Sequence, residues 1–492
     1  MASGFNERLR LIREFGEESL DGRKFRENLV DSKNNIDYFE IIELWFAAVS
    51  LWKKKLFLSG VRDFGIYSYR KNKVRKRMKE LGGKVSKNSI VFFPISETNV
   101  MLFEPIIELF KKNKEPNYIF RYDYSLDGLK KEIEKRGFPY VTFENYLKKR
   151  KRSGIKKIRL KSLKVGKKII SKKKKYSILL PALEYYFGSR RRFYEIIDFV
   201  EGFTNFIESE NPSMIILPDE TLDIARGTSY LCKKFGVPCL VMQHGSITEE
   251  GAEGTETLAI KKIVFGKAVK DYLVKTGMDS RKIEVTGSPI YDAFSKKIDK
   301  KETERLNNKF DLRKNEKVIL FASTGDNARA RPRLESLFKA LKEDKNLKLI
   351  IKQHPAEYYK KSFEEFYKSL ARKNGVKIQI SKDELRPLLH ISNVFVTDFS
   401  TTILEALILR KPIILMNFEG EFKYENYPKF KGVIWHTNHP KDVSGAVSLA
   451  LKSKFGNKEE RFVEKLIKWN MYSADGHSAE RISKLIKKYK LE

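Results

Sequence analysis

The chain has 492 residues, with 99 Lys and Arg against 64 Asp and Glu, so its formal net charge is +35. Hydrophobic residues make up 41% and aromatic residues 12%, which is enough to build cores and excludes a wholly disordered chain. The two cysteines, Cys232 and Cys239, exclude a disulfide framework and a metal site built on several thiolates. At ~150 residues per domain, the length predicts two or three domains.

The positive charge is unevenly placed: in the basic segment Lys148–Lys175, 16 of 28 residues are Lys or Arg, and the rest of the chain still carries 35 − 16 = +19. This segment is either a solvated loop or a surface for an anionic partner: a membrane leaflet, a lipid-phosphate acceptor, an anionic polymer or RNA. No apolar run approaches the ~20 residues of a spanning helix, and the N-terminus lacks the apolar core of a signal peptide. We expect a cytoplasmic protein that can lie against the inner face of the cell membrane.

Residues 1–85 are charged and predicted to form a helical extension. Within it, Tyr38–Trp52 predicts an amphipathic helix that either packs on the first domain or lies in a membrane interface. From Ser89 onward, short apolar runs alternate with helical spacing, which is typical of a parallel sheet. The strands expected in this half are Ser89–Ile95, Tyr118–Arg121, Tyr140–Phe143, Met214–Pro218, Pro238–Gln243, Lys262–Phe265 and Lys282–Val285.

A polar segment at 295–315 marks the expected domain boundary, and a second alternating series follows it. Its predicted strands are Lys317–Phe321, Leu347–Lys352, Val376–Ile380, Asn393–Val396 and Pro412–Met416; the tail from Lys441 is predicted helical. The pattern predicts an α/β fold with two Rossmann-like parallel-sheet domains facing across a cleft. The expected domains are 1–85 (helical extension), 86–300 (with the basic insert 148–175) and 301–492. Ligands of such sheets bind at the carboxyl ends of the strands.

In the first domain, His244 and Gly245 directly follow a predicted strand. An imidazole at that position suits a general base near neutral pH, although a structural loop histidine remains the alternative. Asp219 and Glu220 end another predicted strand, and we expect them to face an acceptor hydroxyl.

In the second domain, Lys352 and His354 project to the same side of an extended segment, as a pair that would suit a leaving phosphate. Ser400, Thr401 and Thr402 place hydroxyls beside the free N–H groups of a helix N-terminus, which is an arrangement that binds phosphate. Ordinary capping by Ser400 is the alternative. Glu405, one turn further along, could reach ribose hydroxyls or simply lie at the surface.

A fourth candidate group is Ser323, Thr324 and Gly325, where glycine allows close backbone approach to a ligand. Arg329, followed by Arg331 and Arg333, could bind phosphates, or form a solvated basic loop. His436 and His439 are predicted to lie in a loop, with i, i+3 spacing but no third metal ligand. We therefore expect no metal and no cofactor.

Taken together, these motifs resemble the GT-B glycosyltransferase superfamily. The nearest branch holds CDP-glycerol glycerophosphotransferases, capsule-polysaccharide transferases and UDP-N-acetylglucosamine 2-epimerase-like proteins. The likeness rests on His244-Gly245, on His354, on Asp398-Phe399-Ser400-Thr401, and on a closing motif with Asp475, Gly476, Glu480, Arg481 and Ile482. It implies a base role for His244, a place near the donor phosphates for His354, and pyrophosphate binding by the segment at Asp398. Gln243 replaces the family's aromatic residue, and the Asp-Ser-Gly-Gly turn of true epimerases is absent.

The expected function is a metal-independent transferase. It would move a glycosyl or glycerophosphate group from a nucleotide-activated donor, of UDP-sugar or CDP-glycerol type, to a cell-surface glycan or lipid-linked acceptor, with His244 as base. Two alternatives remain: an enzyme like the UDP-sugar 2-epimerases or hydrolases, and a non-catalytic protein that binds polyanions or RNA through Lys148–Lys175. In the transferase reading no specific nucleic acid partner is expected, and the basic segment would contact the membrane peripherally.

Overall fold

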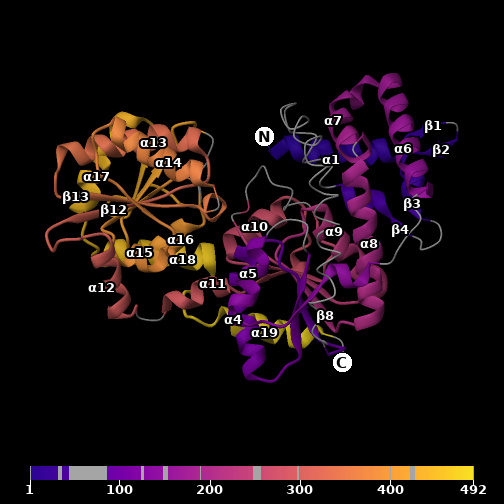
Figure 1. Cartoon of the computed structure of the whole chain (residues 1–492), viewed down its shortest axis with the longest axis horizontal. Helices are drawn as coiled ribbons and strands as arrows, with labels where there is room; N and C mark the ends of the chain where they lie inside the picture. Colours follow the sequence, from indigo (N-terminus) through magenta and orange to yellow (C-terminus); the bar gives the residue numbers. More distant parts are fainter. Residues whose placement is uncertain are drawn as a thin grey trace. The chain divides into compact units, whose positions relative to one another are not determined.

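The computed structural model describes residues 2–20, 22–31, 36–43, 86–122, 127–147, 153–188, 190–245, 247, 256–295, 298–358, 360–398, 400–420 and 427–490. The chain forms two compact units (Figure 1). Unit 1 comprises Met1–Val264, Val269–Val285 and Ala479–Glu492, and unit 2 comprises Phe265–Ala268 and Thr286–Ser478. The division therefore falls before the expected boundary segment 295–315, and the last helix groups with unit 1.

Unit 1 contains a seven-stranded parallel sheet in the order β11-β10-β9-β8-β5-β6-β7. Its strands are short and almost wholly buried, as expected of a sheet covered on both faces. They are β5 (Ile90–Phe92), β6 (Asn117–Arg121), β7 (Tyr140–Thr142), β8 (Met214–Leu217), β9 (Cys239–Met242), β10 (Lys261–Val264) and β11 (Ile283–Val285).

The helices of unit 1 pack apolar residues at helical spacing against this sheet. In α8, Phe199, Phe203 and Phe206 face Phe93, the residue after β5, and Phe120 of β6, with ring centroids 4.4–6.3 Å apart. The helices are α1 (Ala2–Glu17), α4 (Glu97–Lys112), α5 (Asp127–Lys135), α6 (Ser153–Lys172), α7 (Leu180–Leu183), α8 (Arg190–Glu210), α9 (Asp223–Phe235), α10 (Lys267–Lys275, whose first residues belong to unit 2) and α19 (Ser478–Tyr489).

The N-terminal extension is only partly helical. After α1 it forms two short antiparallel ladders, β1 (Ser19–Leu20) with β2 (Arg23–Lys24) and β3 (Val30–Asp31) with β4 (Ile36–Asp37). These two-residue strands lack the alternating run by which sequence reveals a strand, so the prediction of a helical extension missed them. Of the predicted helix Tyr38–Trp52, residues 38–43 are helical, and the rest lies outside the described residues.

Most of the basic segment forms the 20-residue helix α6 rather than a loop. Its inner side carries Arg159, Ser162, Gly166 and Ile169, which are all buried. This i, i+3, i+7, i+10 spacing puts them on one face of a helix, and the lysines occupy the remainder. Residues 148–152 lie outside the described helix.

Unit 2 contains a six-stranded parallel sheet in the order β14-β13-β12-β15-β16-β17. The strands are β12 (Lys317–Ala322), β13 (Leu347–Lys352), β14 (Gln379–Ser381), β15 (Val394–Thr397), β16 (Ile413–Met416) and β17 (Ile434–Thr437). Strand β17 was missed by sequence reasoning, which predicted a loop around His436. Only four residues long, it is recognised as a strand by its pairing with β16.

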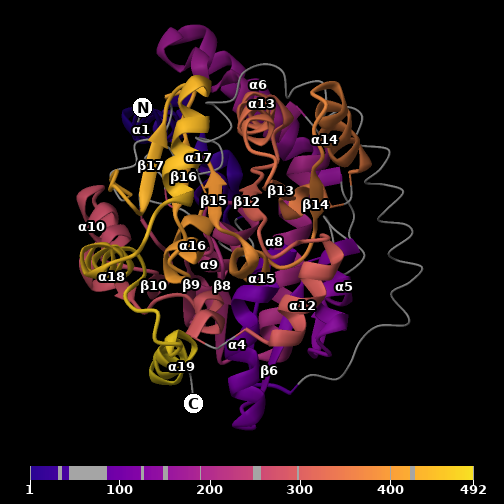
Figure 2. The ribbon, with the colours of Figure 1, turned by 90° about the vertical axis from the view of Figure 1, so that its left-hand side faces the viewer.

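Two helical layers cover the two faces of this sheet (Figures 1 and 2). Alternate residues of one strand enter different cores: Val318 and Leu320 of β12 face one cluster, and Ile319 and Phe321 face the other. The helices are α11 (Pro289–Asp292), α12 (Lys300–Lys309), α13 (Asn327–Glu343), α14 (Lys361–Lys373), α15 (Leu385–Ile391), α16 (Thr402–Ile408), α17 (Val443–Leu451) and α18 (Asn457–Met471).

Candidate functional site

The candidate residues of unit 2 come together at the carboxyl ends of three neighbouring strands, β13, β12 and β15. Ala322 and Lys352 are register partners, and the Ser323 N–H donates to the Lys352 carbonyl at 3.0 Å. On the other side, the Thr324 hydroxyl donates to Oδ2 of Asp398 at 3.2 Å. The loops that carry Lys352, Gly325 and Ser400 therefore form one edge, where ligands of parallel sheets bind.

Lys352 is the buried cation of this edge. Its Nζ donates to the Gln353 carbonyl at 2.7 Å and to the Tyr358 hydroxyl, and it lies 4.8 Å from the centroid of the Tyr358 ring. Burial lowers the pKa of Lys352 to about 8, against the opposing effect of Glu405 and other carboxylates. Burial raises the pKa of Glu405 to about 8, against the opposing charge of Lys352. An anionic ligand would favour the charged lysine here.

His354 lies at the mouth of the same edge, beside Gly325. Gly325 has φ +82°, and a Cβ at that position would lie 3.7 Å from Nδ1 of His354. The left-handed conformation explains the glycine, because other residues adopt it only with strain. Partial removal from water and the nearby charge of Lys352 lower the pKa of His354. The imidazole is therefore mainly neutral near pH 7.

Ser323 points inward, away from any ligand. Its Oγ donates to Oε1 of Glu357 and lies 2.8 Å from the Tyr367 hydroxyl, which donates to Oε2 of Glu357 at 3.0 Å. Ser323 and Glu357 are buried, and desolvation raises the pKa of Glu357. Ser323 thus shapes the loop around Gly325, and its predicted contact with a donor stays a prediction.

The hydroxyl cluster stands at the start of α16. The Ser400 hydroxyl accepts from the Thr402 N–H at 3.3 Å and from the Thr402 hydroxyl at 2.8 Å, although the N-cap position itself is occupied by Thr401. All three hydroxyl residues remain partly exposed. Phe399 lies outside the described residues.

The arginines of α13 differ from one another in role. Arg333 is buried and binds both carboxylate oxygens of Glu419, the carbonyl of Met416 and the carbonyl of Arg329. It therefore holds the fold together and is not available for phosphate. Arg331 lies 5.1 Å from the ring centroid of Phe366, and Arg329 is partly exposed. The first turn of α13 is capped by Asp326, which accepts from the Ala328 and Arg329 N–H groups at 2.8 and 3.3 Å.

In unit 1, His244 follows β9 and bonds back to the end of β8. Its Nδ1 lies 2.8 Å from the carbonyl oxygen of Pro218. A carbonyl only accepts, so Nδ1 carries the hydrogen, and in the neutral ring Nε2 then has a lone pair. The side chain is exposed, and the carbonyl of Gly245 accepts from Nε2 of Gln243 at 2.8 Å. The geometry leaves Nε2 in the tautomer that a general base requires.

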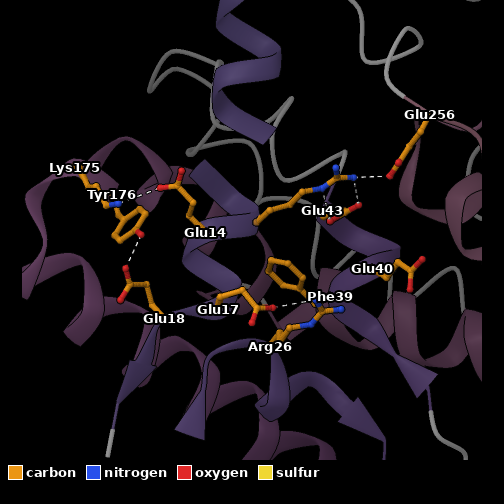
Figure 3. A pocket seen from close by; sticks show the side chains of 11 residues that line it. Glu14, Glu17, Glu18, Arg26, Phe39, Glu40, Glu43, Lys175, Tyr176 and Glu256 are labelled. Carbon is orange, nitrogen blue, oxygen red and sulfur yellow. Dashed lines mark hydrogen bonds and ion pairs between the residues drawn. The ribbon is translucent and has the colours of Figure 1, made fainter. Parts of the chain in front are cut away.

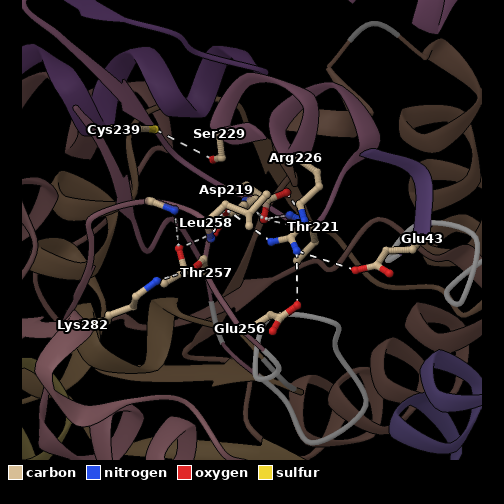
Figure 4. A network of polar contacts seen from close by, with 12 residues as sticks. Glu43, Asp219, Thr221, Arg226, Ser229, Cys239, Glu256, Thr257, Leu258 and Lys282 are labelled. Carbon is tan, nitrogen blue, oxygen red and sulfur yellow. Dashed lines mark hydrogen bonds and ion pairs between the residues drawn. The ribbon is translucent and has the colours of Figure 1, made fainter. Parts of the chain in front are cut away.

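Asp219 and Glu220, the predicted acceptor contacts, are buried and engaged in internal hydrogen bonds (Figure 4). Asp219 accepts from the N–H and hydroxyl of Thr221, both at 2.9 Å. Glu220 accepts from the Thr257 hydroxyl at 2.5 Å and the Leu258 N–H at 2.8 Å. Arg226, 1% exposed, lies within 4 Å of Glu220, Glu43 and Glu256. This network joins three segments of unit 1, and an acceptor contact stays a prediction.

Unit 1 also contains a cavity of about 770 Å³ that is lined mostly by residues of the N-terminal extension (Figure 3). None of the predicted site residues lines it. Six carboxylates line it with three cations and two aromatic rings: Glu14, Glu17, Glu18, Glu40, Glu43 and Glu256; Arg13, Arg26 and Lys175; Phe39 and Tyr176. The excess of negative charge makes it an unsuitable site for an anionic nucleotide donor.

Sequence reasoning assigned no role to Tyr358, Glu357 or Asp326 around the unit 2 edge. Tyr358 contacts Lys352 and Glu357 contacts Ser323 only because of how the loop after β13 folds, and no spacing in the sequence indicates these contacts. Asp326 is the exception, since an aspartate directly before a helix is an ordinary cap signal. Within the described ranges, no group of three or more His, Cys, Asp or Glu could hold a metal ion, and no helix is long and apolar enough to span a membrane.

The part of the chain that contains this edge matches a known protein family. Residues 275–488, which include all of the candidate residues of unit 2, match the model of the family described as CDP-Glycerol:Poly(glycerophosphate) glycerophosphotransferase. The resemblance predicted from the motifs is confirmed for this part of the chain. No curated protein matches.

Solved structures with the same fold include enzymes of two kinds. UDP-GlcNAc 2-epimerases from Methanocaldococcus jannaschii and Neisseria meningitidis are similar, with TM-scores of 0.52 and 0.53, identities of 16% and 15%, and coverage of 81% of this chain and 99% of each of theirs. A glycosyltransferase from Rickettsia africae is similar at TM-score 0.52 and 14% identity, covering 82% of this chain and 99% of its own. At these identities the likeness establishes the fold alone, and it confirms the predicted class of two parallel-sheet α/β domains.

Proposed function

We propose that this protein is a transferase that moves a glycerophosphate group, or in a second version a glycosyl group, from a nucleotide-activated donor to a cell-surface glycan or lipid-linked acceptor. The observation that carries the proposal is the edge formed by β12, β13 and β15. A buried lysine, an imidazole and a hydroxyl cluster converge there, within the part that matches the glycerophosphotransferase family. That family favours a CDP-glycerol donor over a UDP-sugar.

In this proposal the edge of unit 2 binds the donor. Lys352 and His354 stabilise the leaving phosphate, the first by its charge and the second by a hydrogen bond from a mainly neutral ring. Ser400, Thr401 and Thr402 bind the pyrophosphate, with Thr324, the Gly325 backbone and Arg329 beside them. Glu405, whose pKa is raised to about 8, binds the ribose hydroxyls.

Unit 1 presents the acceptor, and His244 is the general base. Nε2 of His244 takes the proton of the acceptor hydroxyl, whose oxygen attacks the phosphorus that bears the glycerol. The bond between that phosphorus and the bridging oxygen of the pyrophosphate breaks, and CMP leaves with the bond's electron pair. With a nucleotide sugar, the attack would fall on the anomeric carbon and release the nucleoside diphosphate. Donor recognition by lysine, imidazole and hydroxyl groups makes the reaction independent of a metal.

The base assignment is tested by His244→Ala, with His439→Ala as a matched control because His439 is an exposed histidine of unit 2. We expect His244→Ala to slow CMP release from CDP-glycerol in the presence of acceptor by about 10²–10⁴-fold, the usual contribution of a general base. Its affinity for CDP should stay within about twofold of the unchanged protein, since an equal affinity means that only the chemical step is lost. Full activity in His244→Ala would exclude the base role.

The donor class is tested by thermal shift with CDP and UDP. A ligand that binds the folded protein raises its melting temperature by mass action. Stabilisation by CDP but not UDP supports the glycerophosphate version, and the reverse supports the glycosyl version. No stabilisation by either nucleotide would contradict the proposal as a whole.

Two of the solved structures with this fold are UDP-GlcNAc 2-epimerases, so the epimerase alternative needs a separate test. Incubation of the protein with UDP-GlcNAc alone, without any acceptor, should leave the nucleotide sugar unchanged if the protein is a transferase. Appearance of an epimer or of free sugar, followed by NMR, would instead establish epimerising or hydrolysing chemistry.

A further inference from the structure

Helix α6 carries a row of lysines that nothing in the described structure neutralises. Lys157, Lys161, Lys164, Lys168 and Lys172, here called the lysine stripe, follow one another at i, i+4, i+7, i+11 and i+15. That spacing places all five on one side of the helix, opposite its buried side. All five are exposed, and none forms an ion pair within the described residues. At 1.5 Å per residue, the stripe is about 22 Å long.

Three other lysines of the basic segment are paired with carboxylates. Lys167, Lys173 and Lys175 pair with Glu184, Glu18 and Glu14 at 2.9, 2.6 and 3.0 Å. The sequence contains no Asp or Glu between Glu144 and Glu184. The stripe therefore has no acidic partner on its own helix.

The lysine stripe destabilises the helix that carries it. Lysines at i, i+4 repel one another along one face, and each such pair destabilises a helix. The helix persists because its other face is anchored in unit 1: Arg159 donates to the carbonyls of Phe187 and Gly188, and Gly166 packs closely against Leu183. A row of lysines that destabilises its own helix, on a helix held by other contacts, indicates a functional surface that binds anions.

We propose that the lysine stripe of α6 docks unit 1 on an anionic lipid surface. A straight row of point charges matches a flat layer of negative headgroups, which attracts each nearby lysine. Leu160 and Ile158, 44% and 37% exposed, lie on the outer part of the same helix and can enter the headgroup region. Figure 1 shows α6 on the periphery of unit 1, beside α7 and α8.

Nucleic acid fits the same residues less well. The stripe is made of lysine only, without the arginine fork that suits phosphate, and Arg159 of this helix is turned inward. The helix has no aromatic side chain on which a base could stack. The inference goes beyond the proposed transfer reaction and does not depend on it.

The test is sedimentation of the full-length protein with vesicles, which contain neither donor nor acceptor. We expect binding to phosphatidylcholine vesicles that contain phosphatidylglycerol and not to phosphatidylcholine alone. The binding should be lost at ~1 M salt, where the Debye length is ~3 Å. A variant with Gln at all five stripe positions should bind at least about tenfold more weakly, since each lysine near such a surface contributes roughly fivefold.

Two matched variants separate the stripe from the overall charge. Gln at Lys301, Lys314, Lys345, Lys373 and Lys377, which are exposed lysines of unit 2, removes the same charge and should leave binding unchanged. Arg at the five stripe positions should also preserve it. Circular dichroism melting checks that each variant is folded.

Three outcomes would overturn the proposal. The first is absence of binding to the anionic vesicles, and the second is an equal loss in the unit 2 control. The third is binding of a double-stranded RNA oligonucleotide that requires the stripe, in a protein that ignores anionic vesicles. Because the vesicles hold no substrate, docking can succeed where the transfer reaction fails, and the two proposals are tested separately.

Discussion

Lys352 and Glu405 are opposite charges that burial pushes toward neutrality. The pKa of the lysine falls to about 8 and that of the carboxyl rises to about 8, in each case because burial disfavours the charged form. Each partner partly counteracts the shift of the other. Such a site binds an anionic ligand most tightly when Lys352 is protonated.

This balance predicts the pH dependence of donor binding. Lys352 is charged below its pKa, so affinity for CDP should be constant near pH 7 and fall as the pH rises through about 8. The terminal phosphate, with a pKa of about 6, is already ionised over this range. Isothermal titration calorimetry between about pH 7 and pH 9 measures the effect.

Two variants serve as controls for this titration. Lys352→Arg stays charged throughout, so its affinity should fall less over this range, and the remaining decline reports the ionisation of Glu405, whose pKa is also about 8. Glu405→Gln removes the carboxylate that favours the charged lysine, so the loss of affinity should begin at lower pH. A decline in Lys352→Arg that equals the decline in the unchanged protein would show that another group titrates.

At the same scale, sequence reasoning found which residues reach the edge but not which way they point. Lys352 and His354 were predicted at this edge because the first ends a strand and the second follows it. Ser323 and Arg333 were not, because a side chain turns inward when it finds a buried partner. Those partners, Glu357 and Glu419, are 34 and 86 residues away in the chain.

Among the elements, α6 shows how a charged segment becomes a helix. Its lysines suit a helix by propensity, but the helix is held by its narrow buried face. Gly166 lies at the closest approach: a Cβ there would be 2.6 Å from Cδ1 of Leu183 and 3.2 Å from Cε2 of Phe25. The glycine is required by this contact rather than by backbone conformation.

Gly166→Val should therefore destabilise the packing of α6. Overfilling a well-packed interior costs about 1–3 kcal/mol, and urea denaturation followed by circular dichroism should show a loss of that size. Gly137→Ala is unsuitable as a control because Gly137 has φ +62°, whereas Gly445→Ala lies in a helix with nothing within 4 Å of the new Cβ. Gly445→Ala should leave stability unchanged or slightly higher. Equal stability of Gly166→Val and the unchanged protein would refute the close contact.

For the whole molecule, the proposal that unit 2 binds the donor and unit 1 the acceptor predicts which unit a nucleotide should protect. Saturating CDP should slow amide hydrogen exchange at the carboxyl ends of β12 and β13 and in the first turn of α16. It should leave β8 and β9 of unit 1 unchanged, since ligand binding protects the backbone that the ligand orders. Hydrogen exchange followed by mass spectrometry measures both units in one experiment. Protection confined to unit 1 would place the nucleotide elsewhere than proposed.

The sequence alone determined the class of fold, because short apolar runs that alternate with helical spacing leave few arrangements other than parallel sheets. It also determined the edge at which Lys352, His354 and Ser400 lie, since the ends of neighbouring parallel strands meet. The tertiary structure decided the features that depend on contacts between residues far apart in the chain. It turned Arg333, Asp219 and Glu220 into internal contacts, showed β17 through its pairing with β16, and placed the last helix with unit 1. It also showed that Lys167, Lys173 and Lys175 of the basic segment pair with carboxylates, whereas within the described residues the five lysines of the stripe do not. A net charge is a sum over the chain, whereas binding depends on which charges lack a partner at short range.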